Sequence, residues 1–300
     1  MFSLFGKRPE IKADGTMAMA AGVLMPDNSK TAQNPAKDPS KNADYAQSAP
    51  GGSKPAPVIG ILGAKGGVGA TTLAINLAVA LAATRKTTLI DTNVQQPDVA
   101  LMLGNQPKYT LADLLDRREH LDEKVLQACC ETIEVPEGKL DFVSPPLDLE
   151  ESLSMDLRGL ADCLPALRSH AGLVVLDLSK QLDSAFMSLI DQCHFIVMVL
   201  EPSLTGILAG KRWLAALLDL GLTQDRIGIA VNRSGGRMKH LEAEITSTLP
   251  VSARWRLPSS FASLEESCLA GEPALVRLPR DGYSKAVRLI ARDLIKEIAD

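Results

Sequence analysis

The sequence predicts a doubly wound α/β fold with a mostly parallel sheet, preceded by a disordered tail. From Val58 onward, short apolar runs rich in β-branched residues alternate with longer segments whose apolar residues have helical spacing. This alternation is typical of parallel sheets covered by helices. A glycine-rich loop joins the first apolar run to the first helical segment, and the first 56 residues show neither pattern.

Residues 1–56 differ in composition from the rest of the chain. They are rich in Pro, Ala, Ser, Asn, Asp and Lys and have few aromatic or β-branched side chains. Such a segment cannot bury enough apolar surface to offset its conformational entropy, so we expect a disordered tail or linker. Within it, residues 2–8 combine Phe and Leu side chains with Lys and Arg. They are either an incidental start of the chain or a weak peripheral contact with a membrane or a partner.

Residues 57–300 are expected to form one domain. The apolar runs predict strands buried on both faces, at 58–62, 87–91, 139–143, 173–178, 195–200, 226–231 and 251–255. Helical spacing predicts helices, at 71–84, 110–117, 121–131, 152–169, 183–192, 204–219, 238–248, 260–270 and 283–298.

The bulk composition excludes several classes of protein. The 300 residues are 46% hydrophobic and carry a net charge of −4, so the charge gives no reason to expect general nucleic-acid binding. No apolar run reaches the ~18 residues that span a bilayer, and the start of the chain lacks a signal-peptide pattern. The five cysteines include no C-x-x-C pair, which favours reduced thiols over a metal site. We therefore expect a cytoplasmic protein.

Residues 63–72 form the loop around which the rest of the chain is arranged. Glycines in this loop allow the backbone to approach a ligand closely and to point several N–H groups at one anion. Two threonines then open a helix whose N-terminus favours negative charge. An ordinary glycine turn is the alternative, but this combination at a strand-to-helix junction favours a phosphate of a nucleotide. The residues expected to bind it are Gly66, Gly67, Val68, Gly69, Ala70, Thr71 and Thr72.

The loop departs from the usual pattern G-x-x-x-x-G-K-[ST]. Gly69 and Thr71 take the positions of the last glycine and the Mg²⁺-binding hydroxyl, but Ala70 stands at the lysine position and a lysine occurs earlier, at Lys65. Residues 65–72 resemble the deviant Walker A motif of the MinD/ParA superfamily. Because a small residue, Ala70, replaces the later lysine, residues 63–72 resemble the form of this motif in the CpaE/TadZ branch. Proteins of that branch take part in assembling Tad-type pili.

That resemblance implies a MinD/ParA-like P-loop NTPase fold with ATP and Mg²⁺ as ligands. It also implies a homodimer that sandwiches the nucleotides, in which Lys65 reaches a phosphate bound by the partner subunit. By the same resemblance, the protein would work with pilus or secretion assembly proteins, recruited to the inner face of the membrane or to the cell pole.

Two predicted strands end in acids beside this loop. Leu173-Val174-Val175-Leu176-Asp177 is a Walker B pattern, whose acid can hold Mg²⁺ through water. Asp91 matches the first acid of the D-x-D motif in the superfamily, and Asn93 replaces the second. Taken alone, each acid could simply end a strand. Together with the loop, they predict Thr71, Asp91 and Asp177 as metal ligands and Lys65, Asp91 and Asp177 as catalytic residues.

The later part of the chain also resembles the superfamily. Asn232 and Arg233 end a strand of the V-x-N-[KR] type, and by resemblance the Asn232 amide bonds the adenine edge; alternatively, it starts the turn at Gly235. Pro258 and Ser259 are the expected contacts of a loop that closes over adenine. The last helix is amphipathic, but acids dilute its basic face, which favours packing against the sheet over membrane binding.

Ala70 and Asn93 lie on the hydrolytic side of an otherwise intact motif set. They predict an ATP-binding, dimerising localisation or assembly factor for a Tad-type pilus system, with weak or absent hydrolysis. One alternative is an active ParA/MinD-type ATPase that positions DNA or cell-surface machinery. Another is a pseudo-ATPase adaptor that binds no nucleotide. The sequence leaves open the partners, whether the dimer needs nucleotide, and the role of the tail.

Overall fold

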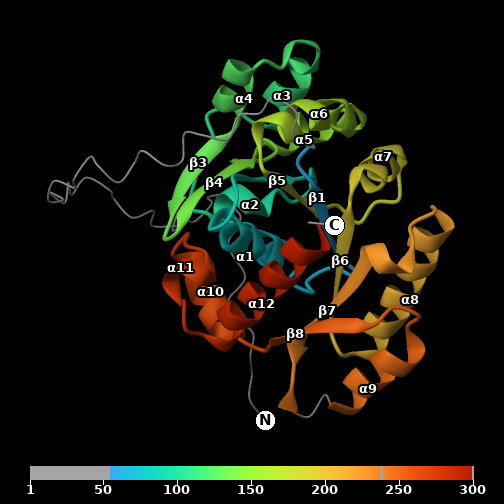
Figure 1. Cartoon of the computed structure of the whole chain (residues 1–300). Coiled ribbons are helices and arrows are strands. Elements are labelled where there is room, and N and C mark those ends of the chain that lie inside the picture. Colours follow the sequence, from blue (N-terminus) through green and yellow to red (C-terminus); the bar gives the residue numbers. More distant parts are fainter. Residues whose placement is uncertain (1–54, 237–238, 299–300) are drawn as a thin grey trace, which may run out of the picture. The chain divides into compact units, whose positions relative to one another are not determined.

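The computed structural model of the chain describes residues 55–236 and 239–298 (Figure 1). Residues 1–54 of the predicted tail, including the apolar and basic residues at its start, lie outside the described residues. Ala56, predicted as the end of the tail, is buried, and its carbonyl accepts a hydrogen bond from Nε of Arg168. The described part is an α/β domain, as predicted, and its single sheet has eight strands where seven were predicted. None of the described helices combines the length and apolar character needed to cross a bilayer.

The sheet has the strand order β3-β4-β2-β5-β1-β6-β7-β8, and only β3 runs antiparallel to its neighbour. The strands are β1 (Val58–Gly63), β2 (Thr87–Asp91), β3 (Glu131–Val135), β4 (Gly138–Val143), β5 (Leu173–Leu178), β6 (Phe195–Leu200), β7 (Ile227–Ser234) and β8 (Ala253–Pro258). Because β1 lies between β5 and β6, the loop after β1 starts at the centre of the sheet. Ligand crevices of such sheets open at the carboxyl ends of the strands.

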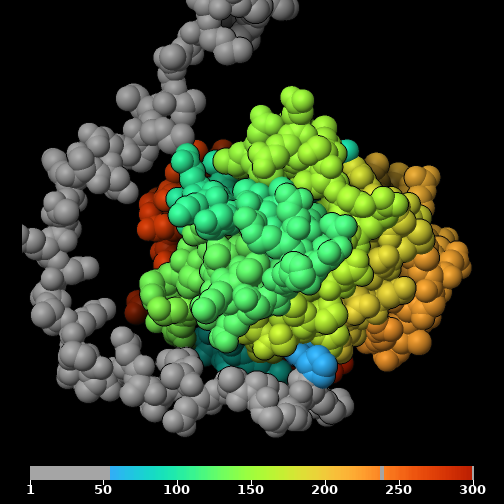
Figure 2. Space-filling model, turned by 90° about the horizontal axis from the view of Figure 1, so that it is seen from above, coloured from blue at the N-terminus to red at the C-terminus, as the bar shows by residue number. Residues whose placement is uncertain are grey.

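Helices cover both faces of the sheet. They are α1 (Ala70–Ala82), α2 (Asp98–Met102), α3 (Leu111–Asp116), α4 (Glu123–Cys129), α5 (Leu149–Ser154), α6 (Leu160–His170), α7 (Ser184–Gln192), α8 (Leu204–Asp219), α9 (Lys239–Thr248), α10 (Phe261–Leu269), α11 (Ala274–Arg277) and α12 (Gly282–Glu297). Figure 2, a view from above, shows the green segment of α3 and α4 forming much of the near face.

The helices pack against the sheet through two apolar cores, one on each face of the sheet. Successive residues of a strand point to opposite faces, so Val58 and Leu62 of β1 enter one core while Ile59 and Ile61 enter the other. The first core is completed by α3, α4, α6, α7, α8 and α9, and the second by α1, α2, α11 and α12. The helix after the glycine loop, α1, is therefore held firmly against the sheet, with Leu73, Ile75 and Leu77 fully buried.

Most predicted elements are confirmed, with three corrections. The helix expected at 152–169 is two helices, α5 and α6, separated by extended backbone at Met155 and a 3-10 turn whose N–H at Arg158 bonds the Asp156 carboxylate. The last two strands begin later than predicted. Strand β3 and helices α2 and α11 were not predicted: β3 is a half-exposed edge strand, and the two helices are short.

Candidate functional site

The loop between β1 and α1 depends on its glycines. Gly67 and Gly69 have φ values of 72° and 87°, in the left-handed region that residues with a Cβ rarely adopt. A Cβ at Gly69 would lie 2.5 Å from Nδ2 of Asn232, whereas at Gly66 or Gly67 it would meet open space. Gly69 is thus needed for close contact with β7, and the open side at Gly66 and Gly67 leaves backbone accessible to a ligand.

Below the loop, Asp177 at the end of β5 is bound to the start of α1. The Thr71 hydroxyl donates to Oδ2 of Asp177 at 2.7 Å, and Nδ2 of Asn93 donates to the same oxygen at 3.3 Å. The other oxygen, Oδ1, is buried and has no hydrogen-bond partner among the described residues. Burial raises the pKa of Asp177 to about 6, although the hydrogen bond from Thr71 and the charge of Lys180 oppose the shift.

This arrangement fits a hydrated divalent cation. The described residues contain no cluster of three His, Cys, Asp or Glu side chains able to hold a metal by themselves. Mg²⁺ commonly uses one or two protein oxygens and completes its shell with water and phosphate. The Thr71 hydroxyl and the unpaired Oδ1 of Asp177 are oxygens of this kind at the N-terminus of α1.

Asp91 lies beside Asp177, because the two residues are paired across β2 and β5. Its Oδ1 accepts the N–H of Asn93 at 2.8 Å and its Oδ2 accepts the N–H of Val99 at 3.2 Å. Burial, together with the charge of Asp177, raises the pKa of Asp91 well above its usual value. In this structure Asp91 shapes the turn before α2, and its direct role toward a metal stays a prediction.

Thr92 was not predicted as part of the site, yet it joins the ends of β2 and β5. Its hydroxyl donates to the carbonyl of Asp177 at 2.8 Å and accepts the N–H of Ser179 at 2.9 Å. The hydroxyl thereby fixes the backbone just after Asp177. A threonine between Asp91 and Asn93 offered no motif that would have revealed this role.

On the other side of the loop, β7 contributes Asn232 and Arg233. Nδ2 of Asn232 donates to the carbonyl of Val68 at 2.8 Å, and Nη2 of Arg233 donates to the carbonyl of Gly67 at 2.8 Å. Arg233 has a φ of 55°, which is uncommon for a residue with a side chain. Both residues therefore hold the loop itself, and the adenine contact expected of Asn232 stays a prediction.

Lys65 forms an ion pair that the sequence did not predict. Its Nζ lies 2.6 Å from Oε1 of Glu201, just beyond the end of β6, and Nη1 of Arg233 lies 2.7 Å from Oε2 of the same carboxylate. An acid at the end of a strand next to β1 was the available signal. Glu201 directly follows the strand predicted at 195–200 and was not predicted as a site residue.

Pro258 and Ser259 lie at the far end of β8. Pro258 is paired with Ser234 of β7, and a Cβ at Gly282, the first residue of α12, would contact its ring. The structure thus brings the residues of the glycine loop together with Asp91, Asp177, Asn232 and Arg233, while the described contacts connect Pro258 to the start of α12.

Comparison with known families places this site in context. An AAA domain family matches residues 56–214, just over half of the chain, including the glycine loop and the strand that ends at Asp177. The chain belongs to this AAA domain family.

Curated relatives extend beyond that segment. An uncharacterized ATP-binding protein of Methanocaldococcus jannaschii is 25% identical over 240 residues, covering 79% of this chain and 87% of the relative. The antiactivator FleN of Pseudomonas aeruginosa is 27% identical over 198 residues, covering 65% of this chain and 69% of FleN. The septum site-determining protein MinD of Thermotoga maritima is 24% identical over 179 residues, covering 59% of this chain and 64% of MinD. Together with the family match, these likenesses support the MinD/ParA superfamily.

Solved structures show the same fold. A ParA family ATPase from Chlorobium tepidum has a TM-score of 0.73 and 23% identity, covering 79% of this chain and 98% of the ATPase. The septum site-determining protein MinD from Pyrococcus horikoshii, solved with Mg-ADP, has a TM-score of 0.68 and 22% identity, covering 80% of this chain and 96% of MinD. The MinD/ParA P-loop NTPase fold predicted from the sequence is therefore confirmed.

Proposed function

We infer that the protein binds Mg²⁺–ATP in the loop of residues 63–72 and dimerises around it, acting as a localisation or assembly factor with very slow or absent hydrolysis. The contact that carries this proposal is the Thr71–Asp177 hydrogen bond between the start of α1 and the end of β5. It leaves Oδ1 of Asp177 buried and without a partner among the described residues. A buried polar oxygen without a partner is costly unless a ligand supplies one.

The names of similar proteins support a nucleotide ligand. The relative in M. jannaschii is called an ATP-binding protein, MinD of P. horikoshii was solved with Mg-ADP, and a putative plasmid partition protein of Borrelia burgdorferi, which has a TM-score of 0.64, was solved with AMPPNP. When bound, Mg²⁺ would neutralise phosphate charge. The chain's own contribution would be the backbone N–H groups of the loop, the Thr71 hydroxyl and the Asp177 carboxylate.

Slow hydrolysis follows from two residues. The methyl group of Ala70 offers no charge to a phosphate, and the neutral amide of Asn93 lacks the carboxylate that could take a proton from water. Removing one preorganised donor from a charged transition state costs on the order of 3 kcal/mol, or ~100-fold or more in rate. Two such losses leave binding possible and turnover very slow.

Calorimetry of the full chain with ATP and Mg²⁺ tests the binding step. We expect saturable binding that weakens when Mg²⁺ is removed, and a Thr71→Ala variant that binds ATP with little Mg²⁺ dependence. Absence of any binding would favour the pseudo-ATPase adaptor instead. Sedimentation with and without ATP then tests dimerisation.

The role in a Tad-type pilus system is the finer part of this proposal. It is supported by the resemblance of residues 63–72, and of the run Asp-Val-Ala-Leu-x-Leu-Gly at 98–104, to the CpaE/TadZ branch. The test is to delete the gene in its host and to follow pilus assembly, together with the position of a fluorescent fusion of the protein. Normal pili in the deletion strain would remove this assignment.

The similarity to MinD, FleN and ParA proteins favours a second candidate, an active ATPase that positions DNA or cell-surface machinery. This candidate predicts rapid turnover, or DNA binding that requires ATP and weakens with salt. Steady-state phosphate release and a salt titration of DNA binding distinguish it from the slow scaffold.

A further inference from the structure

Glu201 binds two cations of the nucleotide loop region with one carboxylate. Its Oε1 contacts Nζ of Lys65 at 2.6 Å and its Oε2 contacts Nη1 of Arg233 at 2.7 Å. The Glu201 side chain is 15% exposed and that of Lys65 is 34% exposed. This ion pair is therefore less exposed to solvent than a typical surface ion pair, and solvent screening reduces its attraction less.

The charges reinforce each other. Burial by itself raises the pKa of Glu201, but the hydrogen bond and charge of Lys65, together with Arg233, hold that pKa below its usual value. The carboxylate is accordingly ionised at neutral pH. Arg233 also donates to the carbonyl of Gly67, so Glu201 is connected through its two cations to both ends of the segment 65–67.

Lys65 therefore has a well-defined place in its own subunit. In the dimer that the resemblance of residues 65–72 implies, Lys65 contacts a phosphate held by a second copy of the chain. The ammonium group has three N–H donors, but the Glu201 carboxylate 2.6 Å from Nζ holds the side chain in its own subunit and competes with that phosphate for its charge. Arg233 would stay on Glu201 after Lys65 leaves, so the carboxylate would not be left buried without a counter-charge.

We propose that Glu201 is a positioning residue that holds Lys65 on its own subunit and thereby opposes nucleotide-dependent association with a second copy of the chain. Formation of the dimer exchanges the Lys65–Glu201 pair for a contact between Lys65 and the partner's nucleotide. This inference rests on the proposed function. It adds that two copies associate only when the bound nucleotide attracts the Lys65 ammonium group more strongly than Glu201 does.

The test is Glu201→Gln in the full chain, which keeps the shape of the side chain and removes its charge. A symmetric dimer breaks two Lys65–Glu201 pairs, so we expect the dissociation constant of the ATP-bound dimer to fall by about tenfold. Sedimentation of both proteins at saturating Mg²⁺–ATP measures it. The matched control is Glu266→Gln, which removes the acid of an ion pair with Arg277 and should leave the dissociation constant unchanged.

A second measurement does not depend on nucleotide. In the ligand-free protein, an amine-reactive reagent should modify Lys65 several-fold faster in Glu201→Gln than in the wild type, as followed by peptide mass spectrometry. Lys211, an exposed lysine of α8, should be modified at equal rates in both proteins. An equal rate of modification at Lys65 in the two proteins would overturn the proposal that Glu201 holds Lys65, independently of any result with ATP.

The outcomes separate the two proposals. Failure of the wild type to bind Mg²⁺–ATP would overturn the proposed function. Intact ATP binding with unchanged or weaker dimerisation of Glu201→Gln would overturn the inference about Glu201 alone. Tighter dimerisation together with faster modification of Lys65 would support it.

Discussion

The surroundings of Asp177 disfavour its ionised form in the ligand-free protein. It is fully buried, its pKa is raised to about 6, and Oδ1 lacks a hydrogen-bond partner among the described residues. A carboxylate whose pKa is higher in the folded than in the unfolded state contributes stability at low pH, and this contribution is lost as pH rises through the folded pKa. At pH 8 the ionised Asp177 therefore destabilises the ligand-free protein.

Replacing Asp177 with Asn should consequently raise the stability of the ligand-free protein at pH 8, by about 1–3 kcal/mol. The same change should abolish the extra stabilisation that Mg²⁺ gives in the presence of ATP. Thermal melts with and without Mg²⁺–ATP measure both effects. Asp162→Asn, at an exposed position in the first turn of α6, is the control. It should lower stability by at most about 1 kcal/mol through the helix dipole and leave the effect of Mg²⁺ unchanged. A lower melting temperature for Asp177→Asn at pH 8 would contradict the argument.

The same pKa predicts a pH dependence for the ligand. As pH falls through about 6, Asp177 takes up a proton and can no longer help to hold Mg²⁺, so the affinity for Mg²⁺–ATP should weaken. Calorimetry between about pH 5 and pH 8 measures this. The phosphates of ATP titrate in the same range, so the dependence that remains in Asp177→Asn gives their share. Identical pH profiles for the two proteins would exclude Asp177 as the titrating group.

Two residues on the hydrolytic side lend themselves to a reversal experiment. Ala70→Lys combined with Asn93→Asp restores a cation and a carboxylate to the loop region and should raise ATP turnover by about 100-fold or more. Thr84→Lys adds a lysine at an exposed position after the other end of α1 and should have no effect. Steady-state phosphate release measures the rates. If the double variant stays as slow as the wild type, the low turnover has another cause.

At the scale of the element, the loop between β1 and α1 is shaped by contacts with its neighbours as well as by its own glycines. Gly69 combines a φ of 87° with a distance of 2.5 Å between an added Cβ and Nδ2 of Asn232. Gly221, between α8 and β7, has a similar φ of 92° but open space around it. Substitutions at the two glycines therefore distinguish the cost of backbone strain alone, at Gly221, from the cost of strain together with a steric clash, at Gly69.

Gly221→Ala should cost about 1–2 kcal/mol, the strain of a left-handed residue with a Cβ. Gly69→Ala should cost more, because Asn232 must also move from its bond with Val68, and it should weaken ATP binding. Urea unfolding and calorimetry measure the two effects. Equal losses of stability in the two variants would show that the contact with Asn232 is unimportant.

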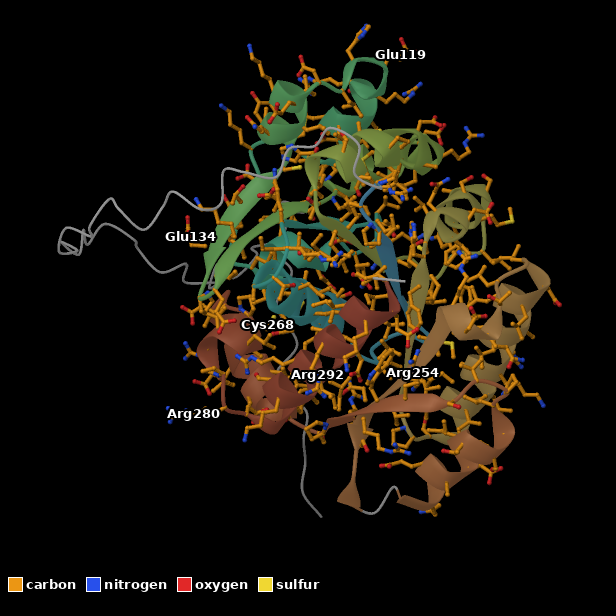
Figure 3. All side chains as sticks on the ribbon, in the orientation of Figure 1. Glu119, Glu134, Arg254, Cys268, Arg280 and Arg292 are labelled. Atoms are coloured by element: carbon orange, nitrogen blue, oxygen red, sulfur yellow. The ribbon has the colours of Figure 1, made fainter. Side chains whose placement is uncertain are left out.

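At the scale of the whole molecule, α12 completes the core beside the nucleotide loop. In Figure 1 it lies next to α1 and β8, and its buried residues share a core with α1. The expectation that this helix packs against the sheet is thus confirmed. Figure 3 shows Arg280 and Arg292 on this C-terminal part of the molecule and Glu119 and Glu134 on the part that carries α4 and β3.

Two leucines on α12 test its role. Leu294 is fully buried and Leu289 is 43% exposed, so Leu294→Ala should lose about 2–5 kcal/mol of stability, whereas Leu289→Ala should lose less than about 1 kcal/mol. Chemical denaturation of both variants measures the difference. If α12 detached readily from the domain, the two losses would be similar and small.

Much of this protein was determined by local sequence patterns. The alternation of apolar strands and helices defined the sheet, because strands buried on both faces need continuous runs of apolar residues. The glycine loop and the strand ends at Asp91 and Asp177 identified a site, since parallel strands bring their carboxyl ends to one edge of a sheet. The edge strand β3 was missed because its half-exposed residues leave only a short alternating pattern.

The tertiary structure alone decided which side chains meet. Thr92 lies 85 residues from the carbonyl of Asp177 that it bonds, and Lys65 meets Glu201 only because β6 is the neighbour of β1 in the sheet. Strand order is set by packing of the whole domain, which no local pattern records. The sequence therefore determined that a glycine loop with a phosphate-binding pattern follows the first strand, and the fold decided that its early lysine is held in its own subunit by a carboxylate shared with Arg233.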